Sequence, residues 1–312
     1  MAVRLTSKRV WMLCLIVLAI LVLMLLRAIS PSRGGDKPAG PPPGEYTLFG
    51  KEQQVVIRGY DGDAMEPFIS KDGRFLLFNN NNEKPANTNL HYSVRVDDLT
   101  FDYKGELAGV NTAALEGVPS LDRKGTLYFV SNRSYDTTHS TLYRGHFSDG
   151  VVTDVQLVPG VSRQEPGIVN FDAEISGDGQ TLYFVDGDFR TKSPPKTADI
   201  VIATLQGDSF SRLPRSAELL SHVNLAGALQ YAPCISEDGL EFFFTRVDRR
   251  DAHPMPQICR VARKTVDEPF DSPQRVQSID GFVEGPTLSA DGHLLYYHKR
   301  DKDRLVICVV RR

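Results

Sequence analysis

The sequence predicts an all-β protein, a five-bladed β-propeller built from four-stranded blades. One twelve-residue pattern, P-T-L-S-A-D-G-H-L-L-Y-Y at 286–297, recurs in five copies along the chain. The turn glycines of the five copies are Gly73, Gly125, Gly179, Gly239 and Gly292. Their spacings of 52, 54, 60 and 53 residues are typical of a repeat architecture, in which each repeat forms one structural unit.

Each copy predicts a hairpin of two buried strands. A short apolar strand precedes the glycine, and four copies turn at Asp-Gly, where glycine accepts a positive φ and the carboxylate binds nearby N–H groups. The second copy has Asp122-Arg123-Lys124-Gly125 instead, which predicts a slightly different turn but no lost blade. The run after the turn does not alternate polar with apolar residues, which predicts a strand covered on both faces.

Two more strands per copy complete the predicted blades. The third strands are expected at 90–96, 141–147, 199–205, 257–261 and 305–310. The fourth strands are expected at 101–107, 151–158, 209–213 and 274–279. Only 20 residues follow Gly292, so the last blade lacks its outer strand, and residues 53–58 are expected to supply it. This closure would remove an open sheet edge that otherwise favours aggregation.

The N-terminal 44 residues predict a membrane anchor and a spacer. Residues 10–26 are uncharged and, as a helix, would be roughly 26 Å long, close to the hydrocarbon thickness of a bilayer. Basic residues before this run predict a cytoplasmic N-terminus, with the propeller on the other side of the membrane. Residues 1–29 are therefore expected to form an uncleaved signal anchor and 30–44 a Pro/Gly-rich linker. The alternative is a signal peptide cleaved after Ser30, a poor context because Pro31 follows.

Composition and cysteine usage narrow the function. The chain has 36 basic and 39 acidic residues, a balance that argues against nucleic-acid binding. Its 41% hydrophobic content allows one sizeable core in the propeller region, 45–312. Three cysteines of that region, Cys234, Cys259 and Cys308, are expected to be buried free thiols. No cysteine or histidine pair has metal-ligand spacing, so neither a metal nor a cofactor is predicted.

The repeated motif P-x-x-S-x-D-G-x-x-L-Y-F resembles the TolB-type, WD-like β-propeller repeat, and the resemblance extends over all five copies. It implies the propeller fold, but repeats of this type serve binding proteins, envelope assembly factors and peptidase propellers alike. The serine-peptidase motif G-x-S-x-G is absent from the sequence. TolB itself also has an additional N-terminal domain, whereas a predicted membrane segment precedes the repeats here. The resemblance therefore implies no particular partner.

The candidate functional residues gather where loops enter the innermost strands or leave the second strands, on one face of the disc. The entering segments carry acidic and amide groups: Glu66, Glu116, Asp172 with Glu174, Gln230 and Glu284. The exits of the second strands carry, among other polar residues, the basic side chains of Arg133, Arg246 and His298. This predicts a funnel with an acidic inner ring and a basic, amide-rich outer ring, suited to a zwitterionic or hydroxyl-rich ligand such as a peptide end or a glycan.

Three interpretations of this funnel remain open. The polar residues could bond neighbouring backbone groups and one another, which we favour; they could bind a ligand or protein partner; or they could be catalytic. Glycoside hydrolysis needs two carboxyl groups at a defined separation, and Glu116 and Glu284 are the candidates. The sequence thus predicts a membrane-anchored, extracytoplasmic binding module (periplasmic in a bacterium) that uses its axial face, with a carbohydrate-active enzyme as the alternative.

Overall fold

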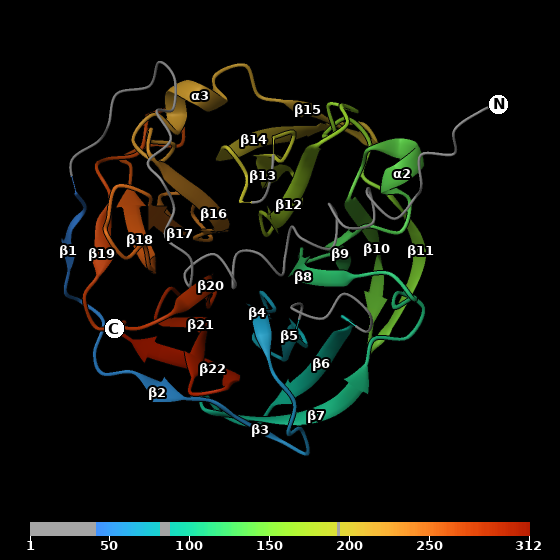
Figure 1. The fold of residues 1–312 in the computed structure, drawn as a ribbon. Helices are drawn as coiled ribbons and strands as arrows, with labels where there is room; N and C mark the ends of the chain where they lie inside the picture. Colours follow the sequence, from blue (N-terminus) through green and yellow to red (C-terminus); the bar gives the residue numbers. More distant parts are fainter. Residues whose placement is uncertain (1–41, 82–87, 192–193) are drawn as a thin grey trace.

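The computed structural model describes residues 42–81, 88–191 and 194–312, which form five β-sheets around a central axis (Figure 1). This confirms the predicted five-bladed propeller. The predicted membrane segment and most of the predicted linker lie outside the described residues. Among the residues that are described, no helix has both the length and the apolar character needed to cross a membrane.

Every blade is an antiparallel sheet whose innermost strand comes first in the chain. Blade 1 consists of β4 (Met65–Ile69), β5 (Phe75–Asn79), β6 (Leu90–Arg95) and β7 (Thr100–Glu106). Blade 2 consists of β8 (Glu116–Leu121), β9 (Thr126–Ser131), β10 (Leu142–Ser148) and β11 (Val151–Leu157). Blade 3 consists of β12 (Ile168–Ile175), β13 (Thr181–Asp188), β14 (Ala198–Gln206) and β15 (Ser209–Arg212). Blade 4 consists of β16 (Ala228–Ile235), β17 (Glu241–Asp248), β18 (Pro256–Ala262) and β19 (Gln274–Val276). Blade 5 consists of β20 (Val283–Leu288), β21 (Leu294–Asp301) and β22 (Arg304–Arg311).

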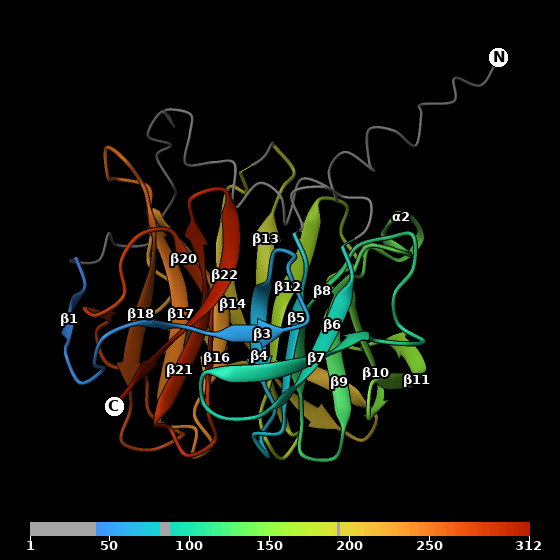
Figure 2. The ribbon, with the colours of Figure 1, turned by 90° about the horizontal axis from the view of Figure 1, so that it is seen from below.

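The two faces of the disc carry different connections (Figure 2). The turn face carries the tight turns after the innermost strands. The loop face carries the longer connections, including the short helices α2 (Tyr135–Thr138) and α3 (Ser216–Leu219). In the first turn Ser70 Oγ donates to Asp72 Oδ1 and accepts from the N–H of Phe75. In the divergent second turn Asp122 Oδ1 accepts the N–H groups of both Lys124 and Thr126, so the blade keeps its turn, as predicted.

The second strands are buried because neighbouring blades cover both of their faces. In β17, Phe242 and Phe244 pack in the same apolar cluster as Phe184 of blade 3. Phe243, between them, packs instead with Leu295 of blade 5. Successive strand residues point to opposite faces, so a strand between two blades needs apolar residues at every position. This explains the runs without alternation in the sequence.

The N-terminal segment covers three blades in succession and not one, which corrects part of the prediction. β2 (Gln53–Gln54) pairs antiparallel with β22 of blade 5, as expected. β3 (Val56–Arg58) pairs instead with β7 of blade 1, and β1 (Gly44–Tyr46) with β19 of blade 4, both in parallel. The chain changes partner at Val55, which is buried in the cluster that joins blades 5 and 1. The segment thus runs along the outer edge of the disc (Figure 1).

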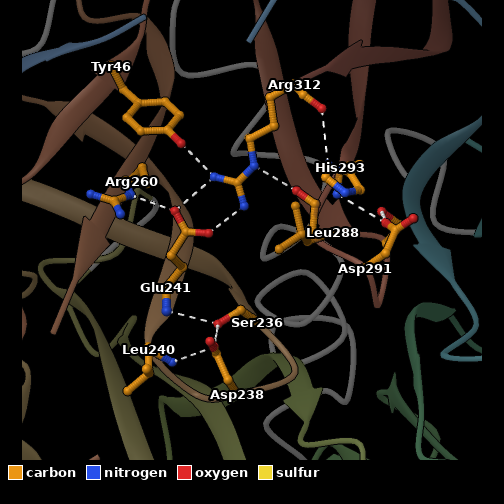
Figure 3. Close-up of polar contacts among 12 residues, drawn as sticks. Tyr46, Ser236, Asp238, Leu240, Glu241, Arg260, Leu288, Asp291, His293 and Arg312 are labelled. Atoms are coloured by element: carbon orange, nitrogen blue, oxygen red, sulfur yellow. Dashed lines mark hydrogen bonds and ion pairs between the residues drawn. The ribbon is translucent and has the colours of Figure 1, made fainter. Parts of the chain in front are cut away.

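Arg312 joins blade 5 to blade 4 and to this N-terminal segment (Figure 3). Its guanidinium group makes a bidentate ion pair with Glu241 of β17. Nη1 lies 2.9 Å from Oε1, and Nη2 donates to Oε2. The same Nη1 lies 2.5 Å from the hydroxyl of Tyr46, and Nε donates to the carbonyl of Gly292 at 2.7 Å. Bidentate arginine–carboxylate pairs are among the stronger polar contacts in proteins. Arg312 therefore helps to close the ring between its last two blades.

Candidate functional site

A bulge interrupts every innermost strand at the same place. The residues at these bulges have φ values of 47° to 64°: Glu66, Val118, Asp172, Ala232 and Gly285. Four of the five precede a proline, at positions 67, 119, 233 and 286. Proline has no N–H to donate, so a strand cannot keep regular pairing there, and a bulge absorbs the irregularity. The predicted site residues Glu66 and Asp172 occupy two of these bulges.

The N–H group at four of these bulges is bound by a side chain of the adjacent blade. Asn79 Oδ1 accepts the N–H of Val118 (3.0 Å), and Thr245 Oγ1 accepts the N–H of Gly285 (3.2 Å). His298 Nδ1 accepts the N–H of Glu66 at 3.2 Å. In blade 3 the residue at the corresponding place is Val185, which cannot accept, and Asp172 Oδ2 instead accepts the N–H of Ala232 at 2.9 Å. These four polar side chains therefore join neighbouring blades to one another at the bulges.

A second set of blade-to-blade hydrogen bonds lies one step closer to the turn face. Ser120 Oγ accepts the N–H of Ile175 (3.0 Å), and Thr287 Oγ1 accepts the N–H of Ile69 (3.3 Å). Cys234 Sγ accepts the N–H of Leu288 at 3.2 Å. The three cysteines of the propeller are buried and free, as predicted. For Cys234 the contact gives the thiol a role in holding blade 4 to blade 5.

Three carboxyl groups from three blades meet near the axis on the side of the loop face: Glu66, Asp172 and Glu284. Burial and the nearby Glu284 raise the pKa of Asp172 to about 7, although the hydrogen bond from Ala232 opposes this. Burial, Asp172 and Glu284 together raise the pKa of Glu66 well above its usual value. A side chain at Gly285 would place its Cβ 2.6 Å from Glu66 Oε2, so the glycine leaves room for this carboxyl group.

Glu284 is held by two buried side chains. The hydroxyl of Tyr231 donates to Oε1, and His298 Nε2 lies 3.3 Å from Oε2. Because His298 Nδ1 accepts the N–H of Glu66, its ring proton must be on Nε2, and it donates that proton to Glu284. His298 has no exposed surface. This predicted outer-ring residue is therefore a buried link between blades 5 and 1.

The space at the axis is very small. A cavity of about 20 Å³ lies among the bulges, lined by Glu66, Asp172 and Glu174 and by the prolines that follow four of the bulges. One water molecule needs roughly 10–15 Å³ when volume is measured this way. The cavity among the bulges therefore has room for about one water molecule.

Glu116 lies apart from the carboxyl cluster. Its carboxylate accepts from Thr112 N (2.7 Å), Thr112 Oγ1 (2.8 Å), Ser131 Oγ (2.8 Å) and Arg133 Nη2 (3.1 Å). The side chain is fully buried, and its contacts in the described residues are all with blade 2 and the loop before it. The structure thus brings Glu66 and Asp172, not Glu116, to Glu284. Glu116 and Arg133 together fix a loop.

Gln230 and Arg246 are direct neighbours on β16 and β17. Gln230 Nε2 donates to the carbonyl of Leu225 (3.1 Å), and Arg246 Nη2 donates to Asp248 Oδ2 (3.0 Å). Within the part of the chain that is described, Arg246 Nε and Nη1 and Gln230 Oε1 have no hydrogen-bond partner although they are buried. Unsatisfied buried groups are rare, so this pair retains hydrogen-bonding capacity.

Two ion pairs that sequence reasoning missed cross the axis near the turn face. Lys71 Nζ of blade 1 lies 3.1 Å from Glu174 Oε1 of blade 3, and both side chains are at most 6% exposed. Arg123 of blade 2 lies 2.6 Å from Glu237 of blade 4. Burial lowers the pKa of Lys71, but Glu174 together with Cys234 and Glu237 outweighs this effect, so the pKa is raised. Lys71 and Glu237 occupy the variable position of Ser-x-Asp-Gly, and Arg123 occupies the corresponding position of the divergent second turn. A charged residue at that position was therefore the available signal.

A larger cavity opens on the loop face, over blade 3, away from the axis. Its volume is about 440 Å³. Polar side chains on its lining include Arg163, Arg190, Arg212, Asp186 and Asp188. Cavities of 300–1,000 Å³ commonly hold small ligands. Elsewhere, among residues 42–81, 88–191 and 194–312, no group of three histidine, cysteine or acidic side chains is arranged to hold a metal ion.

Comparison of sequences assigns this chain to no known family. No protein-family model matches the sequence, and no curated protein matches it. The endo-arabinase of Bacteroides thetaiotaomicron is structurally similar, with a TM-score of 0.55 and 13% identity over 83% of this chain and 97% of its own. The shared feature is the propeller fold. The α-L-arabinofuranosidase domain of Coprinopsis cinerea has a TM-score of 0.52 and 10% identity, covering 84% and 96% of the two chains.

TolB structures are also among the similar ones. TolB from Acinetobacter baumannii has a TM-score of 0.45 and 14% identity over 80% of this chain. The chain spans 55% of the length of that TolB structure. At such low identity these likenesses describe the fold and not the activity.

Proposed function

We propose that this protein is a binding or interaction module that uses the loop face of its propeller, and not a hydrolase. The observation that carries the proposal is the size of the axial cavity, about 20 Å³. Sites for sugars or other small molecules need roughly 300 Å³ or more. A cavity of suitable size lies on the same face over blade 3. Separately, Gln230 and Arg246 of blade 4 have buried polar atoms without a hydrogen-bond partner among the described residues.

The polar side chains near the axis have a structural role that explains their presence without catalysis. Asn79, Thr245 and His298 each bind a backbone N–H of the adjacent blade. A buried N–H without a partner costs about 1–3 kcal/mol, so these contacts contribute to the stability of the closed ring. Polar residues are therefore expected along the axis even when no substrate binds there.

We further propose that residues 10–26 anchor the protein in a membrane, with the propeller on the non-cytoplasmic side. The uncharged run, the basic residues before it and the Pro/Gly-rich stretch after it support this arrangement. A mature protein whose N-terminus lies after Ser30 would contradict it.

A carbohydrate-active enzyme remains the second candidate. It is favoured by one observation, the meeting of Glu66, Asp172 and Glu284 from blades 1, 3 and 5, with Asp172 at a pKa of about 7. A general acid works best when its pKa is near the working pH. In this alternative Asp172 and Glu284 become better candidates than Glu116, whose carboxylate already accepts four hydrogen bonds.

The two candidates differ in one assay. The assay measures release of p-nitrophenol from p-nitrophenyl α-L-arabinofuranoside and from p-nitrophenyl β-D-xyloside between pH 5 and 8. The wild-type propeller, residues 45–312, should be no faster than the Glu284→Gln variant on either substrate. Each substrate requires an axial site several times larger than the cavity present. Turnover by the wild type that falls 100-fold or more in Glu284→Gln would establish the enzyme and overturn the binding proposal.

A further inference from the structure

The cavity over blade 3 lies beyond the end of a short fourth strand. β15 has four residues, whereas β7 and β11 have seven and β19 has three. β15 ends at Arg212, and Pro214 follows closely, where the missing N–H cannot support further pairing. The chain then enters α3, so the end of the blade nearest the loop face has no fourth strand beside β14. The opening is thus a built feature of this blade.

The exposed edge of β14 is already occupied by side chains. Asn224 Oδ1 accepts the N–H of Ile200 (2.8 Å), and Asn224 Nδ2 donates to its carbonyl (2.7 Å). Ser216 Oγ accepts the N–H of Ile202 at 2.9 Å. A ligand in the cavity therefore cannot add to the sheet as another strand. It must be recognised by the side chains of the cavity.

Three arginines and three aspartates, Asp186, Asp188 and Asp199, determine the charge of the cavity. Arg212 is the inner anchor: Nη1 and Nη2 lie 2.7 and 2.9 Å from the two oxygens of Asp186. Arg163 lies 3.0 Å from the same carboxylate, and its side chain is 53% exposed. Arg190 is 55% exposed and is held by Asp188, to which Nε and Nη2 donate at 3.0 and 2.8 Å. Two half-exposed guanidinium groups are thus held in place at the rim.

Arg163 can exchange its partner at low cost. Asp186 also accepts from Arg212 and from Asn170 Nδ2, at 2.6 Å, so it stays paired when Arg163 turns to a ligand. Asp188 orients Arg190, and these hydrogen bonds lower the pKa of Asp188. The two rim arginines can therefore receive an anion without leaving a buried carboxylate unpaired, which would be costly.

We propose that this cavity binds the terminal carboxylate of a peptide, between Arg163 and Arg190, with an aliphatic side chain against Ile200 and Leu213. The proposal rests on the binding function proposed above and names its ligand. Guanidinium groups bind carboxylates through paired, charge-assisted hydrogen bonds. Ile168, Ile200, Leu213 and Pro214 supply an aliphatic wall, and no aromatic ring of the described residues lines the cavity. Sugar rings usually pack on aromatic rings, so the lining favours a peptide over an acidic glycan.

Fluorescence anisotropy can test the proposal on the full chain in detergent micelles. The probes are fluorescein-Gly-Val-Leu with a free C-terminal carboxylate and the same peptide ending in an amide. The free acid is expected to bind at least ten-fold more tightly than the amide. Arg163→Gln and Arg190→Gln are each expected to weaken binding of the acid five-fold or more. Arg58→Gln is the matched control: Arg58 is 54% exposed and paired with Asp102 on the far side of the disc, and its change should have no effect.

Two results would overturn the proposal: equal binding of the acid and the amide, or unchanged affinity in both Arg163→Gln and Arg190→Gln. Direct binding of tri-galacturonate in isothermal titration calorimetry, lost in Arg163→Gln and Arg190→Gln, while the peptide acid does not bind, would assign the cavity to acidic glycans and overturn the peptide ligand. None of these outcomes bears on the hydrolysis assay, so failure of the ligand assignment is distinguishable from failure of the binding function.

Discussion

Lys71→Met is expected to lower the free energy of unfolding by about 3–5 kcal/mol. The variant leaves Glu174 buried, 6% exposed, without the cation that lies 3.1 Å away across the axis. Removing one partner of a buried ion pair costs this much because an uncompensated charge stays in a medium of low dielectric. Urea denaturation of the propeller, followed by circular dichroism, measures the change.

Two variants control this measurement. Lys71→Met combined with Glu174→Gln removes both charges, and because the amide can still accept from Ser120 Oγ, it should recover half or more of the loss. Arg74→Met, at a side chain that is 64% exposed, should cost less than about 1 kcal/mol. If Lys71→Met lowers the free energy of unfolding no more than Arg74→Met does, the axial ion pair does not stabilise the contact between the blades.

Asp172→Asn is expected to stabilise the propeller at pH 8 by about 2–4 kcal/mol and to change the pH dependence of its stability. The pKa of Asp172 is raised from 3.8 to about 7 in the folded state, so the folded protein binds its proton more tightly than the unfolded chain does. The corresponding stability is complete below about pH 4 and is lost as the pH rises to about 7, at roughly 1.4 kcal/mol per unit. The asparagine has no such loss, and its Oδ1 can still accept the N–H of Ala232.

Glu116→Gln is the matched control, another carboxyl-to-amide change on an innermost strand. Glu116 accepts four hydrogen bonds, one of them from Arg133, so the amide should destabilise the protein by about 1–3 kcal/mol at pH 8. The two variants thus change stability in opposite directions. An Asp172→Asn protein that is less stable than the wild type at pH 8 would show that burial does not penalise the Asp172 carboxylate, and hence that the pKa of Asp172 is not raised in the folded state.

Most of the fold could be predicted because local signals repeat five times. Each Asp-Gly turn is encoded by adjacent residues, and strands buried on both faces lack alternation, so strand positions follow from short stretches. The path of residues 44–58 was only half predicted. Val55 is buried between blades 5 and 1, and which edge each flanking residue meets depends on that packing. Sequence spacing alone does not contain this information.

The candidate residues were found in the right region, but their contacts could not be predicted. Glu66 and Asp172 lie at the bulges of their strands and Glu284 directly before one, whereas Glu116 lies two residues before the bulge of blade 2 and outside the cluster. The polar residue six positions after the turn glycine, as in Asn79, Thr245 and His298, signals the bonds between blades. The cavity over blade 3 depends on where β15 ends and on contacts between distant segments. No local motif encodes it.

Site-specific photo-crosslinking tests the central claim most directly, because it shows which face of the propeller meets a partner. A photoreactive phenylalanine at Ala217, exposed beside the blade 3 cavity on the loop face, is compared in living cells with one at Ser148, exposed on the turn face. A discrete, light-dependent adduct from position 217 and none from position 148 is the predicted result. Adducts from position 148 alone would place the partner on the turn face and contradict the account.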